Sequence, residues 1–357
     1  MSVFHGKSIS ISIFGQSHSE AIGVVLEGIP AGKTVDMDAL RAFMARRAPS
    51  ASAFSTSRKE PDEPVFVGGV VNGVTTGAAV CALIFNKDAR SRDYSALMYT
   101  PRPGHADFAA RMKYGGAEDI RGGGAFSGRM TAPLCIAGGL AIQWLGEKGI
   151  TVGSHIASVA GIEDVMFDPL DLPADELTAP GRKAFGTISD AAGEAMLSAI
   201  AKARAEQDSL GGVIECAAVG VPAGLGGELF DGIESTLARL VFSVPAVKGF
   251  EIGTGFGAAK LTGSENNDGF AYQEGVVKTL TNNHGGILGG ITSGLPLVFR
   301  AAIKPTPSIG KKQQTVDLAA GENTEIEIGG RHDACIVPRA LPVMEACMAL
   351  ALLDEMM

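Results

Sequence analysis

Residues 100–132 read TPRPGHADFAARMKYGGAEDIRGGGAFSGRMTA. In this stretch His105 follows a Pro-Gly turn, and Asp107 comes two residues later. A run of three glycines, 122–124, leads toward residues 133–145, which are apolar nearly all round and predict a buried helix. Because a helix N-terminus offers unpaired N–H groups and the positive end of a dipole, the glycine run predicts an anion-binding site.

A glycine-rich loop before a core helix usually binds nothing, so the glycine run is weak evidence when it is taken alone. Its surroundings strengthen the prediction, because the same stretch is rich in cations although the chain has a formal net charge of −9. These cations are Arg102, Arg111, Lys113, Arg121 and Arg129. We therefore expect a ligand site in which Arg129 is a bidentate clamp for an anion.

The composition indicates a globular, turn-rich protein, with 46% hydrophobic residues, 19% charged residues and 48 glycines in 357 residues. The negative net charge argues against non-specific binding to nucleic acid or to an anionic membrane surface. The five cysteines are far apart and form no C-x-x-C pair, so we expect free thiols rather than disulfides or a metal site. The sequence shows neither a signal peptide nor a run of transmembrane length, and we expect a cytoplasmic protein.

Hydrophobic periodicity predicts a mixture of strands and helices. Strands are expected at 8–14, 22–26, 65–71 and 77–85, and helices at 38–47, 191–207 and 233–242. A closing helix is expected to bury one stripe of residues, Val343, Ala346, Cys347, Leu350 and Leu353. The polar, proline-bounded segment 50–64 predicts a loop that closes over a ligand.

Two short motifs recur in the same order. GIPAG at 28–32 returns as GVPAG at 220–224, and VTTG at 74–77 returns as ITSG at 291–294. The repetition predicts a duplicated unit folded about a pseudo-twofold axis, with repeats at about 8–150 and 211–350. Because no long polar linker separates the two halves, we expect one domain over residues 1–357.

The chain resembles the chorismate synthases. The resemblance lies in RPGHAD, KYGG and SGRMTA of the first stretch, in FGQSHSEAIG near the N-terminus, in NNHGGILGGITSGLPLVFRAAIKPTPSI, and in GRHDACIVPRALPVMEA near the C-terminus. These blocks occur in the family's order from residue 14 to about residue 350, which is far more specific than any single motif.

The resemblance implies an α+β fold, a β-α-β sandwich with a helical core between two sheets. It also implies a homotetramer and a reaction in which reduced FMN stays bound. In that reaction 5-enolpyruvylshikimate 3-phosphate loses phosphate and a ring proton in an anti-1,4-elimination, giving chorismate without net redox change. This is the last common step of the shikimate pathway to aromatic amino acids. The sequence leaves open whether the chain reduces its flavin with NADPH or depends on a partner reductase.

The resemblance also implies roles for individual residues. His105 is the acid next to the flavin, His18 is the acid near the departing phosphate, and Ser17 and Asp333 carry the ring proton. The substrate clamps are Arg47, Arg102, Arg129 and Arg331. The residues that border FMN are Ser127, Ala246, Gly289, Lys304, Thr306, Ser308 and Arg331. From the residues alone, an ordinary histidine satisfied by one hydrogen bond is the favoured interpretation of His18, and Asp333 can be a helix cap or a partner of Arg331.

The chain also departs from the family pattern. The first box reads GQSHS rather than GESHG, Ala53 stands where many members have a basic residue, and residues 125–131 read AFSGRMT where RSSARET is common. An FSGR variant of that segment is known in the family, so we interpret these changes as divergence within it. The alternative is a non-catalytic relative that binds a phosphorylated ligand or a flavin.

Overall fold

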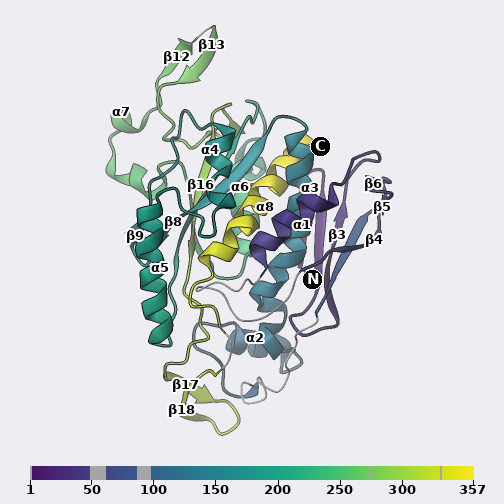
Figure 1. The fold of residues 1–357 in the computed structure, drawn as a ribbon, viewed down its shortest axis with the longest axis vertical. Helices are drawn as coiled ribbons and strands as arrows, with labels where there is room; N and C mark the ends of the chain where they lie inside the picture. The colour runs from purple at the N-terminus through teal and green to yellow at the C-terminus, as the bar shows by residue number, and fades with distance from the viewer. Residues whose placement is uncertain (1, 49–61, 87–97, 274, 330–331) are drawn as a thin grey trace.

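The computed structural model describes residues 2–48, 62–86, 98–273, 275–329 and 332–357. Most of the predicted loop at 50–64, including Ala53, therefore lies outside the described residues, and its closure over a ligand stays a prediction. Figure 1 shows two sheets with helices between them. The α+β class expected from the sequence is thus present as a mixture of helices and antiparallel sheets.

The first sheet is antiparallel and has the strand order β1-β2-β3-β7-β4. Its strands are β1 (Ser2–His5), β2 (Ser10–Gly15), β3 (Ala21–Glu27), β4 (Val65–Gly68) and β7 (Val80–Phe85). Burial alternates along β7, because one face of the sheet is turned toward the helices and the other away from them.

The second sheet is also antiparallel and has the order β11-β16-β10-β8-β9. Its strands are β8 (Thr151–Val159), β9 (Ile162–Glu163), β10 (Gly212–Val219), β11 (Val247–Ile252) and β16 (Leu297–Ile303). Four two-stranded ribbons complete the strands: β5 (Val70–Val71) with β6 (Val74–Thr75), β12 (Phe270–Gln273) with β13 (Val276–Thr279), β14 (Ile287–Leu288) with β15 (Ile291–Thr292), and β17 (Gln313–Asp317) with β18 (Glu322–Ile326).

The helices of the central layer touch both sheets. The α-helices of the described chain, central and peripheral together, are α1 (Met37–Arg47), α2 (Asp107–Tyr114), α3 (Thr131–Gly146), α4 (Ala174–Thr178), α5 (Asp190–Ala205), α6 (Ile233–Ser243), α7 (Gly263–Asn266) and α8 (Val337–Met356). Helix α3 packs on β2, β3 and β7 of the first sheet, and α8 packs on β8 and β10 of the second. Helices α1 and α6 pack against this central pair, while α5 lies beside β9 at the edge of the molecule.

The prediction for the closing helix is wrong in one respect. We expected α8 to bury one stripe, but its residues are buried on all sides from Leu341 to Asp354. The reason is its position, because α8 is surrounded by α1, α3 and α6 as well as by β8 and β10. Helix α3 is buried nearly all round, as its apolar sequence predicts, and it begins at Thr131, slightly before the expected start.

The repeated motifs make matching hydrogen bonds, while the duplication itself stays a prediction. Strands β2, β3, β7 and β4 are adjacent in that order, and so are β8, β10, β16 and β11. In the first half the Thr75 hydroxyl donates to the Pro30 carbonyl at 2.6 Å and accepts the Lys33 N–H at 2.9 Å. In the second half the Thr292 hydroxyl donates to the Pro222 carbonyl at 2.7 Å and accepts the Leu225 N–H at 2.9 Å.

Two further expectations from composition can be checked against the structure. All five cysteines are free thiols, and four of them are buried, as predicted. None of the described helices is both long enough and apolar enough to cross a lipid bilayer.

Candidate active site

A cavity of about 760 Å³ lies where the ends of several elements meet. Its volume is in the range typical of ligand sites. Its walls come from the end of α1, the segment before α3, the connection from α6 to β11, the end of β16 and the start of α8. Cations are frequent in the lining: Arg47, Arg102, Arg129, Lys248, Lys304 and Arg339.

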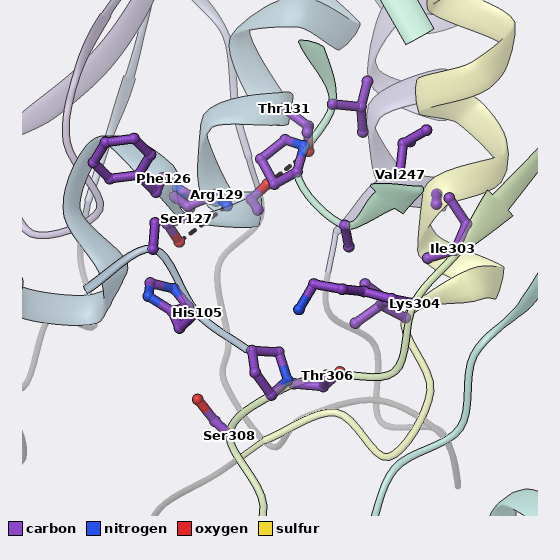
Figure 2. A pocket seen from close by; sticks show the side chains of 18 of the residues that line it. His105, Phe126, Ser127, Arg129, Thr131, Val247, Ile303, Lys304, Thr306 and Ser308 are labelled. Carbon is purple, nitrogen blue, oxygen red and sulfur yellow. Dashed lines mark hydrogen bonds between the residues drawn. The ribbon is translucent and has the colours of Figure 1, made fainter. Parts of the chain in front are cut away.

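Most of the residues predicted from the sequence line this cavity. They are Arg47, Arg102, His105, Ser127, Arg129, Ala246, Lys304, Thr306, Ser308 and Asp333. Figure 2 shows how His105, Ser127 and Lys304 surround the same space. Among the described residues, Ser17, His18 and Gly289 do not belong to the lining. Arg331 lies outside the described residues.

The glycine run forms the wall between the two predicted catalytic histidines. Gly122, Gly123 and Gly124 have φ angles of 61°, 87° and 55°, in the left-handed region that side chains other than glycine seldom adopt. A Cβ atom on Gly122 would lie 2.2 Å from His18 Cε1, and one on Gly123 would lie 3.1 Å from His105 Nε2. The run therefore has to be glycine both for its backbone conformation and because the rings lie so close.

His18 and Ser17 lie on the far side of this wall. They follow β2 in the turn before β3, and both are buried. Gly122 lines the cavity, and a Cβ atom on it would also lie 2.6 Å from Ser17 Oγ. The two residues thus reach the cavity wall through Gly122, and their catalytic roles stay predictions.

His105 is held by an acid that follows it by two residues. The His105 Nδ1 atom lies 2.5 Å from Asp107 Oδ1 at the start of α2. Burial acts to raise the pKa of Asp107, but hydrogen bonds from Arg102 and His105 outweigh it and lower that pKa. An ionised Asp107 keeps the proton on Nδ1, which leaves Nε2 beside Gly123 as the nitrogen that can exchange a proton.

Arg102 contacts the His105–Asp107 pair. Its side chain donates to both carboxylate oxygens of Asp107, each at 2.7 Å, and to Ser308 Oγ at 3.4 Å. The side chain is nearly fully buried. Most of its donors are therefore committed within the protein, and its role as a substrate clamp stays a prediction.

Arg47 and Arg129 share one acid, Asp62. The Nη1 group of each arginine donates to a different oxygen of the Asp62 carboxylate. Arg47 also donates from Nε to Thr131 Oγ1 and from Nη2 to the Gly128 carbonyl, each at 3.1 Å. The two predicted clamps, which belong to α1 and to the turn before α3, are therefore held side by side at the cavity wall.

The start of α8 adds a second ion pair to the same wall. The Arg339 side chain donates to Asp333 Oδ2 at 2.6 Å and to the Arg47 carbonyl at 3.0 Å. Burial lowers the pKa of Arg339, and Asp333 offsets part of this effect. This geometry places the predicted catalytic acid Asp333 next to the predicted clamp Arg47.

Lys304 lies on the opposite side, directly after β16. Its ammonium group donates to the Gly104 carbonyl at 2.7 Å, and in the described part of the chain it has no carboxylate partner. Burial and the neighbouring charge of Lys248 lower the pKa of Lys304. A partly buried lysine beside a second lysine fits a site that receives an anion.

Sequence reasoning missed three polar residues of the site, Asp62, Thr131 and Arg339. Asp62 belongs to the polar segment 50–64 of the sequence and gives no local signal, because its partners Arg47 and Arg129 are 15 and 67 positions away. The role of Asp107 could have been inferred, since an acid two residues after a turn-mounted histidine is a natural partner for its ring.

Comparisons with known proteins agree with the geometry. A sequence model of the family described as chorismate synthase matches residues 9–357. Chorismate synthase of Thermococcus gammatolerans is 47% identical over 353 residues, which cover 99% of this chain and 97% of that protein. Chorismate synthase of Methanosarcina acetivorans is 45% identical over 353 residues, covering 99% and 95%.

A solved structure supports the same conclusion. A crystal structure of chorismate synthase matches this fold with a TM-score of 0.78 at 27% sequence identity, covering 98% of this chain and 92% of that one. The sequence match extends over nearly the whole chain and includes the segments that line the cavity. The chain belongs to the chorismate synthase family.

Proposed function

We propose that this chain catalyses the reaction of its family, the anti-1,4-elimination of phosphate from 5-enolpyruvylshikimate 3-phosphate to give chorismate. The observation that supports it best is one cavity that joins a wall of buried arginines to the His105–Asp107 pair. The substrate carries a phosphate and carboxylates, so it requires cations, and its elimination requires groups that move protons near neutral pH. Both kinds of group line the same space.

Reduced FMN fits the opposite wall as the cofactor. Lys304 and Lys248 place two positive charges at the end of β16 and the start of β11, and the hydroxyls of Thr306 and Ser308 follow. Such a cluster suits the phosphate of FMN. When bound, reduced FMN supplies an electron to the reaction and recovers it, so that no net redox change results.

The protein's own residues then hold and move protons. His105 Nε2 lies at the cavity wall next to Gly123, and Asp107 orients the ring from the other side. We assign His18 to the departing phosphate, and Asp333, held by Arg339, to the ring proton together with Ser17. Buried arginines exclude water around the substrate anions and strengthen their attraction.

Anaerobic incubation with substrate and reduced FMN tests this function directly. We expect release of inorganic phosphate together with the absorbance of chorismate. Each protein molecule should release many phosphate molecules rather than one. A folded protein that binds the substrate or flavin but releases no phosphate would instead support the non-catalytic alternative.

We further propose that four copies assemble and that the protein acts in the cytoplasm. The hairpin of β12 and β13 projects from the body, and it exposes apolar side chains to solvent (Figure 1). These are Phe270, Tyr272, Val276 and Val277. Exposed apolar patches of this kind mark interfaces with other chains. Light scattering after gel filtration should give about four times the chain mass of 36.7 kDa.

We also propose that residues 1–357 form one domain that arose from two similar units. The matching order of four strands in each sheet and the matched hydrogen bonds of Thr75 and Thr292 support this. The main hydrophobic cluster includes residues of both sheets and of the helices between them, so the two halves share it.

A further inference from the structure

Asp62 is a buried acid that has no role in the function proposed so far. Its residue is 1% exposed and its carboxylate is fully buried, although the cavity lies close by. Among the described residues that line the cavity, Arg47 and Arg129 are present and Asp62 is not. The acid therefore stands behind the two arginines and faces the protein interior rather than a ligand.

The contacts of Asp62 immobilise both guanidinium groups. Each carboxylate oxygen accepts one Nη1 donor, so that a single side chain sets the spacing between Arg47 and Arg129. The other donors of Arg47 are anchored by Thr131 and Gly128, and Nε of Arg129 donates to Asn86 Oδ1 at 3.0 Å. Arginines held in this way lose little conformational entropy when an anion binds.

The backbone of Asp62 adds a second indication. Its φ angle is +53°, in the left-handed region that a residue with a side chain adopts at a cost. Residues keep such a conformation when surrounding contacts determine it, and here those contacts are the two arginines. The backbone conformation and the two ion pairs together fix the orientation of the Asp62 carboxylate.

Charge explains what the acid achieves. Two guanidinium groups side by side repel each other, and an ionised carboxylate between them removes that repulsion. Burial acts to raise the pKa of Asp62, but Arg47 and Arg129 outweigh it and lower that pKa, so the group is ionised at neutral pH. One negative and two positive charges leave one net positive charge for a ligand anion.

We propose that Asp62 is a positioning residue that fixes Arg47 and Arg129 at the spacing required by an anionic group of the substrate. This proposal rests on the proposed function, because it takes the substrate to be 5-enolpyruvylshikimate 3-phosphate. It extends that function because part of the affinity for the substrate anion then depends on Asp62, an acid that does not touch the substrate. An acid at this place strengthens anion binding because it acts through the arginines.

The test is the substitution Asp62→Asn in the full-length protein loaded with FMN. Asparagine keeps the size but removes the charge and presents N–H donors to one arginine, so the pair separates. We expect KM for the substrate to rise by roughly 10- to 100-fold, with a smaller change in kcat, because misplacement of binding groups costs about this much. FMN affinity should stay within about twofold, because Asp62 pairs with Arg47 and Arg129, whereas Lys304 donates to the Gly104 carbonyl.

Two further variants separate positioning from general stability. Asp354→Asn removes a carboxylate that is equally buried and accepts the N–H groups of Lys7, Ser8 and Ile9, away from the cavity. It should lower stability but leave KM unchanged. Asp62→Glu keeps the negative charge between the arginines, but its extra methylene displaces them. Because the charge is kept, KM should rise less than in Asp62→Asn.

A double-mutant cycle shows whether Asp62 acts through its partner. Arg129→Lys removes the guanidinium fork, so Asp62→Asn should raise KM less in that background than in the wild type. Equal effects in both backgrounds, or wild-type KM in both Asp62 variants, would overturn the proposal.

Calorimetric titration of the substrate into the protein measures substrate affinity without turnover, so it tests the positioning role independently of the reaction. If the wild-type protein binds the substrate but releases no phosphate, the proposed function fails, and weaker binding by the Asp62 variants still supports the positioning role. If the wild type turns over and the Asp62 variants bind the substrate equally well, the positioning role fails and the function stands.

Discussion

The two halves of the chain each place a helix end at the cavity but give it different chemistry. Helix α1 ends at Arg47, and α6 ends at Ser243, followed by Val244. Both ends line the cavity. Arg47 is buried among polar partners, whereas Val244 is buried in the hydrophobic core. The two helix ends thus offer the cavity different side chains, and the predicted clamps Arg47, Arg102 and Arg129 all come from the first half.

The ends of two corresponding strands differ in the same way. Asn86 follows β7 and holds Arg129, whereas Lys304 follows β16 and points its ammonium group into the cavity (Figure 2). We infer that the first half supplies both predicted catalytic histidines and the clamps Arg47 and Arg129, and that the second half supplies Lys304 for the cofactor phosphate together with the predicted proton carrier Asp333. The comparison teaches that strands in corresponding places of the two sheets can end in side chains of different chemistry.

The largest expected effect comes from the histidines of the first half. His105→Ala and His18→Ala should each lower turnover by roughly 100- to 10000-fold, the usual contribution of general acid catalysis, while binding persists through the arginines. Single-turnover absorbance under anaerobic conditions measures this. As the control from the second half, His284→Asn keeps an acceptor for the Gly286 N–H and should turn over normally. Normal turnover in either first-half variant would contradict the division of roles.

A matched pair of glycines tests the wall between the histidines. Gly122 and Gly289 both have a φ angle of 61°, but a Cβ atom meets His18 at Gly122 and nothing within 4 Å at Gly289. Both alanine variants should lose about 1–2 kcal/mol of stability from the backbone strain. Gly122→Ala should also lower turnover by about 100-fold, because His18 is displaced. If Gly289→Ala weakens FMN binding, Gly289 borders the flavin as the family resemblance implies.

The cation of the second half is tested by Lys304→Met. Because charge-assisted hydrogen bonds contribute about 1.5–3 kcal/mol, FMN affinity should fall by roughly 10- to 100-fold in a flavin-fluorescence titration. Lys311→Met is the control, since Lys311 is exposed and pairs with Asp208 at 2.8 Å outside the cavity. Equal FMN affinity in the two variants would show that the phosphate binds elsewhere.

The smallest effects concern the scaffold itself. Thr75→Val and Thr292→Val each leave a carbonyl and an N–H group of the equivalent turn without a partner. Each should lower the free energy of unfolding by about 1–3 kcal/mol, and by similar amounts, in chemical denaturation. Markedly different losses would show that the two turns are not equivalent, and activity per folded molecule should change little in both.

The sequence by itself determined the features that depend on neighbouring residues. The apolar segment at 133–145 became α3, and the capped pattern at 38–47 became α1, because amphipathicity and capping act over one or two helical turns. The glycine run and the pair of His105 and Asp107 were visible for the same reason, since their partners are close in the chain. Motif order placed most of the cavity residues.

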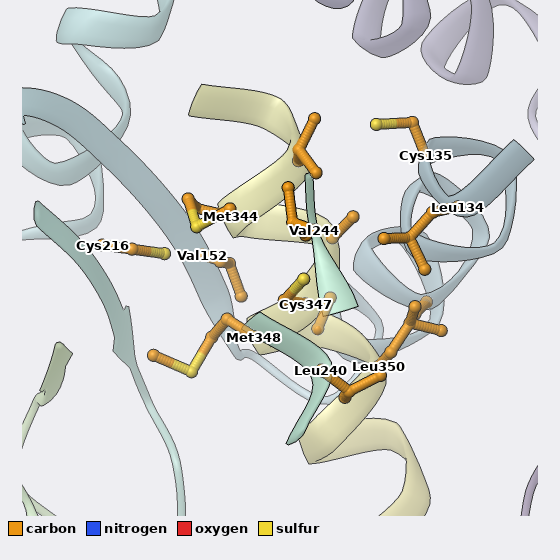
Figure 3. Packing of buried hydrophobic residues seen from close by; sticks show 14 of the residues in the cluster. Leu134, Cys135, Val152, Cys216, Leu240, Val244, Met344, Cys347, Met348 and Leu350 are labelled. Carbon is orange, nitrogen blue, oxygen red and sulfur yellow. The ribbon is translucent and has the colours of Figure 1, made fainter. Parts of the chain in front are cut away.

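Only the tertiary structure decided how distant residues meet. Helix α8 is buried on every side, and Figure 3 shows its residues packed among side chains of α3, α6, β8 and β10. The labelled residues of this packing are Leu134, Cys135, Val152, Cys216, Leu240, Val244, Met344, Cys347, Met348 and Leu350. No local period predicts it, because burial on the second face depends on where the other sheet lies.

The site followed the same rule. The role of Arg102 as a substrate clamp stays a prediction, but its hydrogen bonds to Asp107 and Ser308 were not predicted from the sequence. Asp62 met Arg47 and Arg129 because the first sheet, α1 and the start of α3 converge at one end of the helical layer. A buried carboxylate requires cationic partners, and these partners are brought to it by the tertiary structure. The neighbouring residues in the sequence indicate neither the burial of the carboxylate nor the identity of its partners.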